Sequence, residues 1–195
     1  MKALVKNDLL NIIEYEKIRD EYRKKLIEYK KHRRIALGPN ITITFENRKT
    51  IKFHIQEMMR TERMVKSSQI QSELDIYNPL LPPKNSLSAT LFIEIREAEN
   101  IRPMLNQFIG LTTGKNMLIK KGDLKIYAQF EDGREEEDKI SAVHYIQFHF
   151  NESDKNSFFD EGHPVELIID FNEYNYNVKL PSKMIASICE DLTSI

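Results

Sequence analysis

Segments that alternate apolar and polar residues fill the second half of the chain, and they restrict the possible folds more than any other feature. In the clearest segment, Leu87–Ile95, apolar residues at odd-numbered positions alternate with mostly polar ones. Successive side chains of a strand point to opposite faces, so this period of two is typical of a strand with one buried face. The same pattern predicts strands at Asn116–Lys120, Asp123–Phe130, Ala142–Phe150, Pro164–Phe171 and Tyr176–Leu180, the last two joined by a hairpin turn over Asn172–Asn175.

The first half of the chain has the spacing of helices instead. Apolar and aromatic residues from Ile18 to Tyr29 recur every three or four positions and predict a helix over Glu16–Arg33. Gly38-Pro39 ends this helical region because proline cannot continue a helix. Further helices are expected from Asp8 with Asn7 as its cap, over Ser68–Tyr77, over Glu97–Phe108 and after Pro181, and a strand is expected over Ile41–Glu46.

The segment that follows Asn47 fits two structures. Ile51, Phe53 and Ile55 alternate as in a strand, whereas Ile51 and Ile55 with the methionines that follow have helical spacing. The residues as far as Lys66 are strong helix formers, and Thr50 can act as the N-cap. We therefore predict a helix over 50–66.

Early helices and late strands predict an α+β protein with N-terminal helices packed on a mainly antiparallel sheet and a C-terminal helix. A chain of 195 residues is long enough to bury a substantial core. We expect a single domain over 1–195, helix-rich over 1–83 and sheet-rich over 84–195.

Composition excludes several kinds of partner and compartment. The net charge of −1 gives no overall field that favours nucleic acid or a membrane surface. Apolar runs such as Val165–Ile169 are far shorter than a membrane span, and the N-terminus lacks the apolar stretch of a secretory signal. Cys189 is the only cysteine, so an internal disulfide is excluded. We predict a cytoplasmic protein without nucleic-acid or membrane partners.

One histidine–carboxylate pair has a spacing that metal sites use. His54 and Glu57 lie three residues apart and would share one face of a helix, but the order is reversed relative to the Glu-x-x-His pairs of di-iron bundles, and no second copy exists. His144 and His149 fall on opposite faces of a strand. We predict no metal and no cofactor, a polar pair at the edge of a helix for His54 and Glu57, and an inward, hydrogen-bonded His144.

No nucleotide-binding or nucleophile motif is present. The loop Gly110–Asn116 resembles a phosphate loop, but it is one residue too short between its glycines and lacks a serine or threonine after Lys115. A turn between a helix and a strand is expected there. Cys189 lies in an apolar helical stripe, which favours a small core residue over a nucleophile.

Charge is also clustered along the chain. Basic residues would line the end of the long helix: Lys24, Lys25, Lys30, Lys31, Arg33 and Arg34. Cations near a helix C-terminus interact favourably with its dipole, so a solvated helix face is expected without any ligand. The acidic segment Glu131–Asp138 balances this charge and is expected to be a mobile turn.

The predicted central helix carries the charges that local structure leaves unexplained. The candidate ligand-binding residues are Arg48, Glu57, Arg60, Glu62 and Arg63. Carboxylates and guanidiniums interleaved at spacings of three and four either join a helix to its neighbours or line a pocket for a charged ligand. Both interpretations stay open.

Four blocks of the chain resemble a bacterial family of uncharacterised proteins about this long: RRIALGPNITITFENRKTIKFHIQEMMRTER, ELDIYNPLLP, LSATLFIEI and SAVHYIQF. The resemblance extends from Asp8 to Leu192. The family has no established activity, so it supplies no catalytic residue. His54 and His144 stand where the family usually has glutamine, which argues against metal ligation at either position.

The resemblance implies a biological context. Genes of the family lie beside those for rubrerythrin-like di-iron proteins and for iron–sulfur oxidoreductases related to heterodisulfide reductase. This implies a non-catalytic accessory protein that docks on a redox enzyme of peroxide or oxidative-stress metabolism. The alternative function is a small-molecule-binding domain or enzyme whose polar pocket is built from Arg48, Glu57, Arg60 and Glu62.

Overall fold

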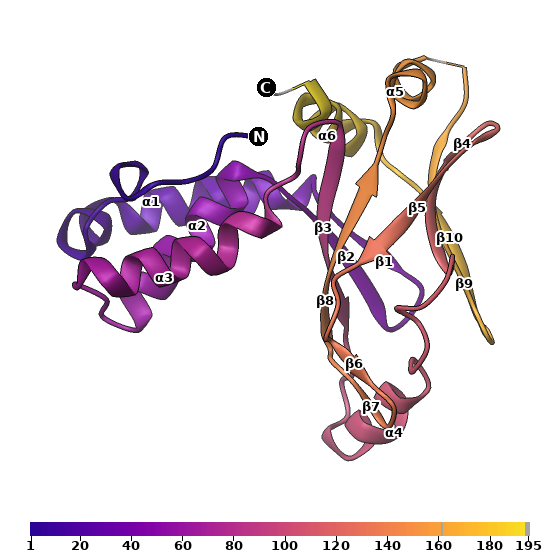
Figure 1. Cartoon of the computed structure of the whole chain (residues 1–195), viewed down its shortest axis with the longest axis horizontal. Coiled ribbons are helices and arrows are strands. Elements are labelled where there is room, and N and C mark those ends of the chain that lie inside the picture. The colour runs from indigo at the N-terminus through magenta and orange to yellow at the C-terminus, as the bar shows by residue number, and fades with distance from the viewer. Residues whose placement is uncertain (161, 194–195) are drawn as a thin grey trace.

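Eight strands form one antiparallel sheet, with helices grouped beside it and at one end (Figure 1). The structure is a computed structural model and describes residues 1–160 and 162–193. Across the sheet the order is β1 (Arg34–Leu37), β2 (Ile41–Glu46), β3 (Ser86–Ile93), β8 (Val143–His149), β5 (Leu124–Phe130), β4 (Met117–Lys121), β9 (Val165–Phe171) and β10 (Tyr174–Lys179). The predicted α+β class, with N-terminal helices, an antiparallel sheet and a C-terminal helix, is confirmed.

The helices occur in three groups. The described α-helices are α1 (Ile12–Lys31), α2 (Arg48–Thr61), α3 (Ser67–Tyr77), α4 (Ile101–Asn106), α5 (Glu152–Phe159) and α6 (Ser182–Thr193), with short 3-10 turns η1 (Lys6–Asp8), η2 (Asn78–Leu80) and η3 (Ala98–Asn100). Helices α1, α2 and α3 lie together on one side of the sheet, and α5 and α6 lie at its upper end in Figure 1. Within the described part of the chain, no helix is both long and apolar enough to cross a membrane.

The inner face of the sheet carries the main hydrophobic core. The expected alternation is seen on β9, where Val165, Leu167 and Ile169 are buried and the residues between them are more exposed. Helix α6 packs on the same core through Met184 and Ile188. Burial of these apolar side chains is the main favourable contribution to folding of this half of the chain.

The sheet curls until its two edge strands meet at Tyr174. The Tyr174 hydroxyl on β10 donates to the Leu37 carbonyl on β1, at 2.8 Å, and accepts from the backbone N–H of Ile41 at 3.1 Å. Gly38 makes this contact possible, since a Cβ there would come within 2.6 Å of the Tyr174 hydroxyl and its φ is +77°. Only glycine combines that backbone conformation with so close an approach.

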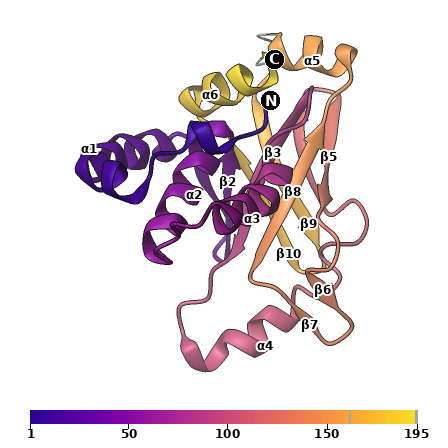
Figure 2. The same cartoon turned by 60° about the vertical axis from the view of Figure 1, so that its left-hand side comes forward.

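Helices α2 and α3 enclose a second, smaller core. Its buried apolar residues are Leu4, Ile51, Ile55, Met59, Leu74 and Leu81. None of these residues belongs to the main core. Figure 2 shows α2 and α3 side by side, next to the strands β2, β3 and β8. The expectation that all 195 residues form one domain stays a prediction.

Two predicted helix starts were wrong. Where a separate helix was expected from Asp8 with Asn7 as its cap, Lys6–Asp8 form a 3-10 turn. The long helix begins at Ile12 instead of Glu16, because the Asn11 side chain caps it by accepting from the Glu14 N–H. Helix α2 begins at Arg48 because the Asn47 side chain accepts from the N–H groups that follow. The Thr50 hydroxyl in turn accepts a hydrogen bond from the Asn47 backbone N–H. The helix also ends at Thr61, earlier than the predicted 66.

Two predictions about loops and charged segments were also wrong, and one helix was not predicted. Residues Arg34–Leu37 form β1 and not a helix end. Helix α5 is not among the predicted elements, although the capping pair Asn151 and Asp154 marks its start. The acidic segment forms a hairpin of β6 (Glu135–Glu136) and β7 (Lys139–Ile140), and Glu135 accepts from the Gly110 and Thr112 N–H groups, so the segment is tied to the rest of the protein.

The basic cluster is divided between surface and interior. Lys25 and Lys31 pair with glutamates on the exposed face of α1, as expected for a solvated helix. Arg33, in contrast, is completely buried. The chain turns inward after α1, so this side chain extends into the junction of three helices and the sheet.

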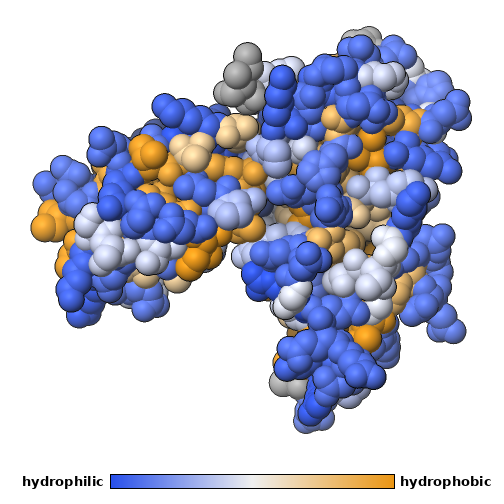
Figure 3. Space-filling model, viewed as in Figure 1, coloured by the Kyte–Doolittle hydropathy of each residue, from blue (hydrophilic) through white to orange (hydrophobic). Residues whose placement is uncertain are grey.

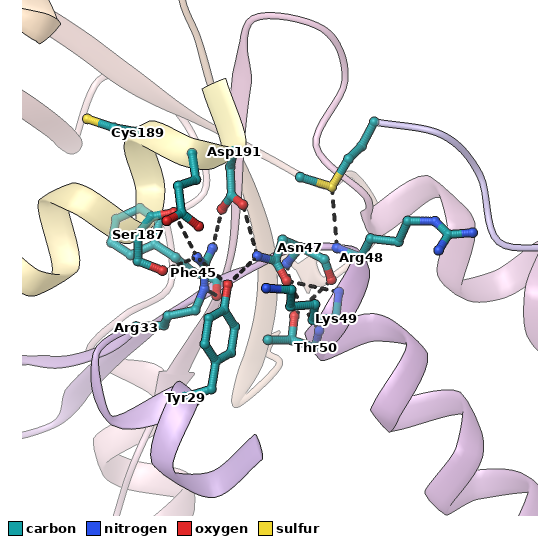
Figure 4. Close-up of polar contacts among 12 residues, drawn as sticks. Tyr29, Arg33, Phe45, Asn47, Arg48, Lys49, Thr50, Ser187, Cys189 and Asp191 are labelled. Atoms are coloured by element: carbon teal, nitrogen blue, oxygen red, sulfur yellow. Dashed lines mark hydrogen bonds and ion pairs between the residues drawn. The ribbon is translucent and has the colours of Figure 1, made fainter. Parts of the chain in front are cut away.

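Arg33 joins the helices to the sheet through a buried polar network (Figure 4). Its Nε donates to the Phe45 carbonyl on β2 at 2.8 Å, and its Nη1 donates to the Ser187 hydroxyl on α6 at 2.8 Å. Its Nη2 pairs with the Asp191 carboxylate, whose other oxygen accepts from Asn47 at 2.9 Å. Each charge is therefore paired and hydrogen-bonded, as burial requires.

Removing one partner of this pair is expected to be strongly destabilising. Asp191→Ala leaves the Arg33 guanidinium buried without its counter-charge and should lower the free energy of unfolding by about 3–5 kcal/mol. Chemical denaturation measures this change. Lys183→Ala, at an exposed position of the same helix, is the matched control and should change stability by less than about 0.5 kcal/mol. Equal effects of the two substitutions would contradict the assigned role.

His144 faces the core, as predicted, and is completely buried. Its Nε2 is hydrogen-bonded to the Ser141 carbonyl at 2.7 Å, whereas its Nδ1 has no partner among the described residues. Burial lowers the pKa of this imidazole below its ordinary value, although the Ser141 carbonyl and the Glu135 carboxylate oppose the shift. The folded protein therefore favours the neutral ring.

This lowered pKa makes stability sensitive to acid. The unfolded chain binds a proton at His144 near pH 6.5 and the folded chain does so only at lower pH, so stability should fall as pH drops below about 6.5. A difference of one bound proton between the unfolded and folded states changes the free energy of unfolding by about 1.4 kcal/mol per pH unit, which is the upper limit for His144. His144→Gln retains a donor for Ser141 without titrating, so its unfolding free energy should fall less steeply between about pH 6.5 and 5. Parallel slopes for the two proteins would rule out this contribution.

Candidate functional site

Four polar residues form a row across the outer face of the sheet. Glu46 on β2 pairs with Ser88 on β3, Ser88 pairs with Gln147 on β8, and Gln147 pairs with Gln129 on β5. Residues opposite each other in a sheet project to the same side. The row therefore faces away from the main core, toward α2 and α3.

This row forms the floor of a cleft, which we call the sheet cleft. Its volume is about 360 Å³, and its lining residues are Glu46, Pro79, Leu80, Ser88, Ala89, Gln129, Phe130, Glu131, Asp132, Tyr145, Ile146, Gln147 and His149. Pro79 and Leu80 come from η2, directly after α3, and cover one side of the row. Figure 2 shows this end of α3 beside β3 and β8, and Gln147 Nε2 donates to the Pro79 carbonyl at 3.4 Å.

The local sequence explains why the chain leaves the sheet beside this row. Glu46 ends β2, and Asn47 begins α2 as its cap while its side chain is held by Asp191. The chain therefore turns away from the sheet at the buried Arg33 network. Helix α3 then returns it, and Pro79 in η2 ends the helical segment over the row.

One side chain on the floor of the cleft lacks the hydrogen-bond partner that a buried polar group normally has, and a second has a single partner. Ser88 is 4% exposed, and its Oγ has no hydrogen-bond partner within the described ranges. Glu46 is 8% exposed, and its carboxylate accepts one bond, from the Thr90 hydroxyl at 3.1 Å. An unsatisfied buried polar group costs about 1–3 kcal/mol, so such groups call for an explanation.

Tyr145 and His149 form the wall beside the row. The Arg134 guanidinium lies over the Tyr145 ring at 4.9 Å from its centre and pairs with Glu131 at 2.9 Å. Burial raises the pKa of the Tyr145 hydroxyl, which keeps it protonated as a hydrogen-bond donor. His149 is hydrogen-bonded through Nδ1 to Ser86 at 2.8 Å, which fixes the orientation of its ring.

The predicted site residues lie elsewhere, and most of them contact α1 or the N-terminal segment. Arg48 pairs with Asp8 at 2.6 Å and donates to the Lys2 carbonyl at 3.2 Å. The Arg48 guanidinium and the Val5 N–H lower the pKa of the Asp8 carboxyl. Arg60 pairs with Glu16 on α1 at 2.8 Å.

Glu57 has a complete set of partners. Arg19 donates to both carboxylate oxygens, at 2.9 and 2.8 Å, and the Tyr15 hydroxyl donates at 2.7 Å. The Arg19 guanidinium is the main reason that the pKa of Glu57 lies below its ordinary value. His54 is bonded to Tyr77 at 2.8 Å instead of joining Glu57. These contacts attach α2 to α1 and α3.

Glu62 and Arg63 are exposed at the C-terminal end of α2. The five predicted residues do not surround one pocket: Arg60 and Arg63 line an open groove between the start of α1 and the end of α2, and the other three do not. Their role in binding a ligand stays a prediction.

Sequence reasoning missed the residues of the sheet cleft. Alternation identifies Ser88, Gln147 and Gln129 only as polar positions of predicted strands. The prediction that His149 projects to the face of the strand opposite His144 is confirmed. A row of this kind depends on the register of strands that are far apart in the chain. The available signal was the run of small polar residues on the outer face of β3, Ser86, Ser88 and Thr90, because small side chains leave room for a hollow.

The fold and the cleft define an α+β protein with a curled antiparallel sheet and a polar hollow on its outer face. The family model described as "Protein of unknown function (DUF3501)" matches residues 3–192, and the chain belongs to this family. The predicted membership of an uncharacterised family is thereby confirmed. A comparison with curated proteins found no match.

A solved structure has the same fold along its whole length. It is the crystal structure of a novel protein of unknown function from Burkholderia pseudomallei K96243, which is 29% identical to this chain. The match covers 98% of this chain and 100% of that protein, with a TM-score of 0.89.

Proposed function

We propose that this protein is a small-molecule-binding domain whose ligand occupies the sheet cleft. The observation that carries the proposal is the Ser88 hydroxyl, which lines the cleft, is almost completely buried and has no partner within the described ranges. A ligand that supplies this partner would offset the cost of burying the group. The volume of about 360 Å³ lies in the range of small-molecule sites.

The framework of the cleft also suits a binding site. Its floor consists of paired strands, which hold side chains more rigidly than loops do. One wall is η2, and the opposite rim is the segment after β5 with Glu131 and Asp132. A ligand would therefore meet a rigid polar floor below and Leu80 of η2 beside it.

Filling the cleft tests this proposal. Ser88→Leu places a large side chain in the hollow and should abolish fragment binding detected by ligand-observed NMR, because the volume is no longer available. Ser153→Leu makes the same change at an exposed position of α5 and should leave binding intact. Circular dichroism and thermal unfolding verify that both variants are folded. Fragments that bind the wild type and the folded Ser88→Leu variant equally well would refute the proposal.

We propose a second candidate function, an accessory protein that docks on a rubrerythrin-like or iron–sulfur redox protein. The observation that favours docking is the groove between α1 and α2, which we call the apolar groove and which is lined by Ile12, Ile13, Glu16, Lys17, Arg60, Thr61, Arg63 and Val65. Ile13 and Val65 are 74% and 77% exposed there. Figure 3 shows apolar surface on this helical part of the molecule. Partner sites combine exposed apolar groups with arginine in this way.

The redox identity of the partner rests on the family resemblance alone, so its test uses purified proteins. Calorimetry with a rubrerythrin-like protein from the same genome should show binding that Ile13→Asp with Val65→Asp abolishes. Ile76→Asp, at a position of α3 that is 59% exposed, is the control and should leave binding unchanged. Undetectable binding, or equal loss in the control, would eliminate the docking role.

A further inference from the structure

The charge on the lining of the sheet cleft is one-sided. Three carboxylates, those of Glu46, Glu131 and Asp132, belong to the lining, and no lysine or arginine does. Arg134 is paired with Glu131, and within the described ranges neither Glu46 nor Asp132 has an ion pair with a lysine or arginine. His54 interacts electrostatically with Glu46, but burial lowers the pKa of its imidazole, which favours the neutral ring. An anionic ligand would meet repulsion here, whereas a cation would be attracted.

Glu46 differs from the other deeply buried carboxylate in this respect. Asp191 is 7% exposed and has both the Arg33 guanidinium and the Asn47 amide as partners. Glu46 is buried to a similar degree, and its one hydrogen-bond donor is the neutral Thr90 hydroxyl. Buried charges are normally paired, so a cation is the kind of ligand group that would complete the contacts of Glu46.

The remaining groups of the row specify the kind of cation. Gln147 donates its amide to Pro79, which leaves its amide oxygen free to accept, and the Ser88 Oγ accepts as readily as it donates. Glu46, Ser88 and Gln147 thus present three acceptors side by side along the row. A primary ammonium group carries three N–H donors. The described residues form no group of three histidine, cysteine or acidic side chains able to hold a metal ion, which favours an organic cation.

One aromatic residue of the cleft suits the rest of such a ligand. The Tyr145 ring lines the cleft, and the Arg134 guanidinium over it shows that this ring can lie against a cation. From these contacts we infer that the sheet cleft selects a small primary amine with an apolar or aromatic body, its ammonium group bound by Glu46, Ser88 and Gln147. This inference rests on the proposed small-molecule function and adds the chemical class of the ligand.

Three probes of similar shape and different charge test the inference: benzylamine, benzyl alcohol and benzoate. Titrations followed by NMR of the full chain should show benzylamine binding with a Kd below about 1 mM, and benzyl alcohol at least about tenfold weaker. Benzoate should bind most weakly because of Glu46 and Asp132. A Kd for benzylamine no lower than that for benzyl alcohol overturns the inference, as does undetectable benzylamine binding.

Glu46→Gln separates charge from shape. Glutamine retains an acceptor for Thr90 and nearly the same volume, so the fold and benzyl alcohol binding should persist, while benzylamine should bind at least about tenfold more weakly. Glu14→Gln, at an exposed position of α1, removes one negative charge far from the cleft and should leave all three affinities unchanged. If both variants lose the same benzylamine affinity, the preference for benzylamine comes from the net charge of the protein. That result would overturn the assignment to Glu46.

The two proposals fail in different ways. If benzoate or benzyl alcohol binds best and Ser88→Leu abolishes that binding, the amine inference is overturned and the cleft remains a binding site. If the folded Ser88→Leu variant still binds every fragment that the wild type binds, the proposal that the sheet cleft is a binding site is refuted. The amine inference, which depends on that proposal, is then refuted as well.

Discussion

The buried pair of Arg33 and Asp191 is the interaction on which the arrangement of the elements depends. Burying either charge alone would cost several kcal/mol, so the pair persists only if both partners and their hydrogen bonds are in place. Those bonds come from the end of α1, from Phe45 on β2, from the start of α2 and from α6. Satisfying one charge pair therefore sets the positions of three helices relative to the sheet.

The sheet cleft follows from that anchor. Glu46 immediately precedes Asn47, which both caps α2 and contacts Asp191, so the place where the chain leaves the sheet is determined by the network. The second core between α2 and α3 then brings Pro79 back over the row of polar residues. A polar hollow persists beside the row because Ser88 is too small to fill it and its neighbours Glu46 and Gln147 are polar.

The two buried carboxylates, Asp191 and Glu46, differ in how completely the protein supplies their hydrogen-bond and ion-pair partners. Asp191 has its cation and its amide, and its burial is explained entirely by the fold. Glu46 has a single neutral donor, and the adjacent Ser88 has none within the described ranges. Natural structures satisfy most buried polar groups, so the incomplete set on the floor of the sheet cleft supports the proposed ligand there.

The sequence alone determined the class of fold, because alternation and helical spacing are local and report which face of each element is buried. It also contained a local signal for the start of α5, the capping pair of Asn151 and Asp154. Arg33 looked like a surface cation within a basic run, and only the packing of α6 against the end of α1 turned it into a buried anchor. The row from Glu46 to Gln129 was decided by tertiary structure for the same reason: strand register joins residues distant in the chain, and no local pattern encodes it.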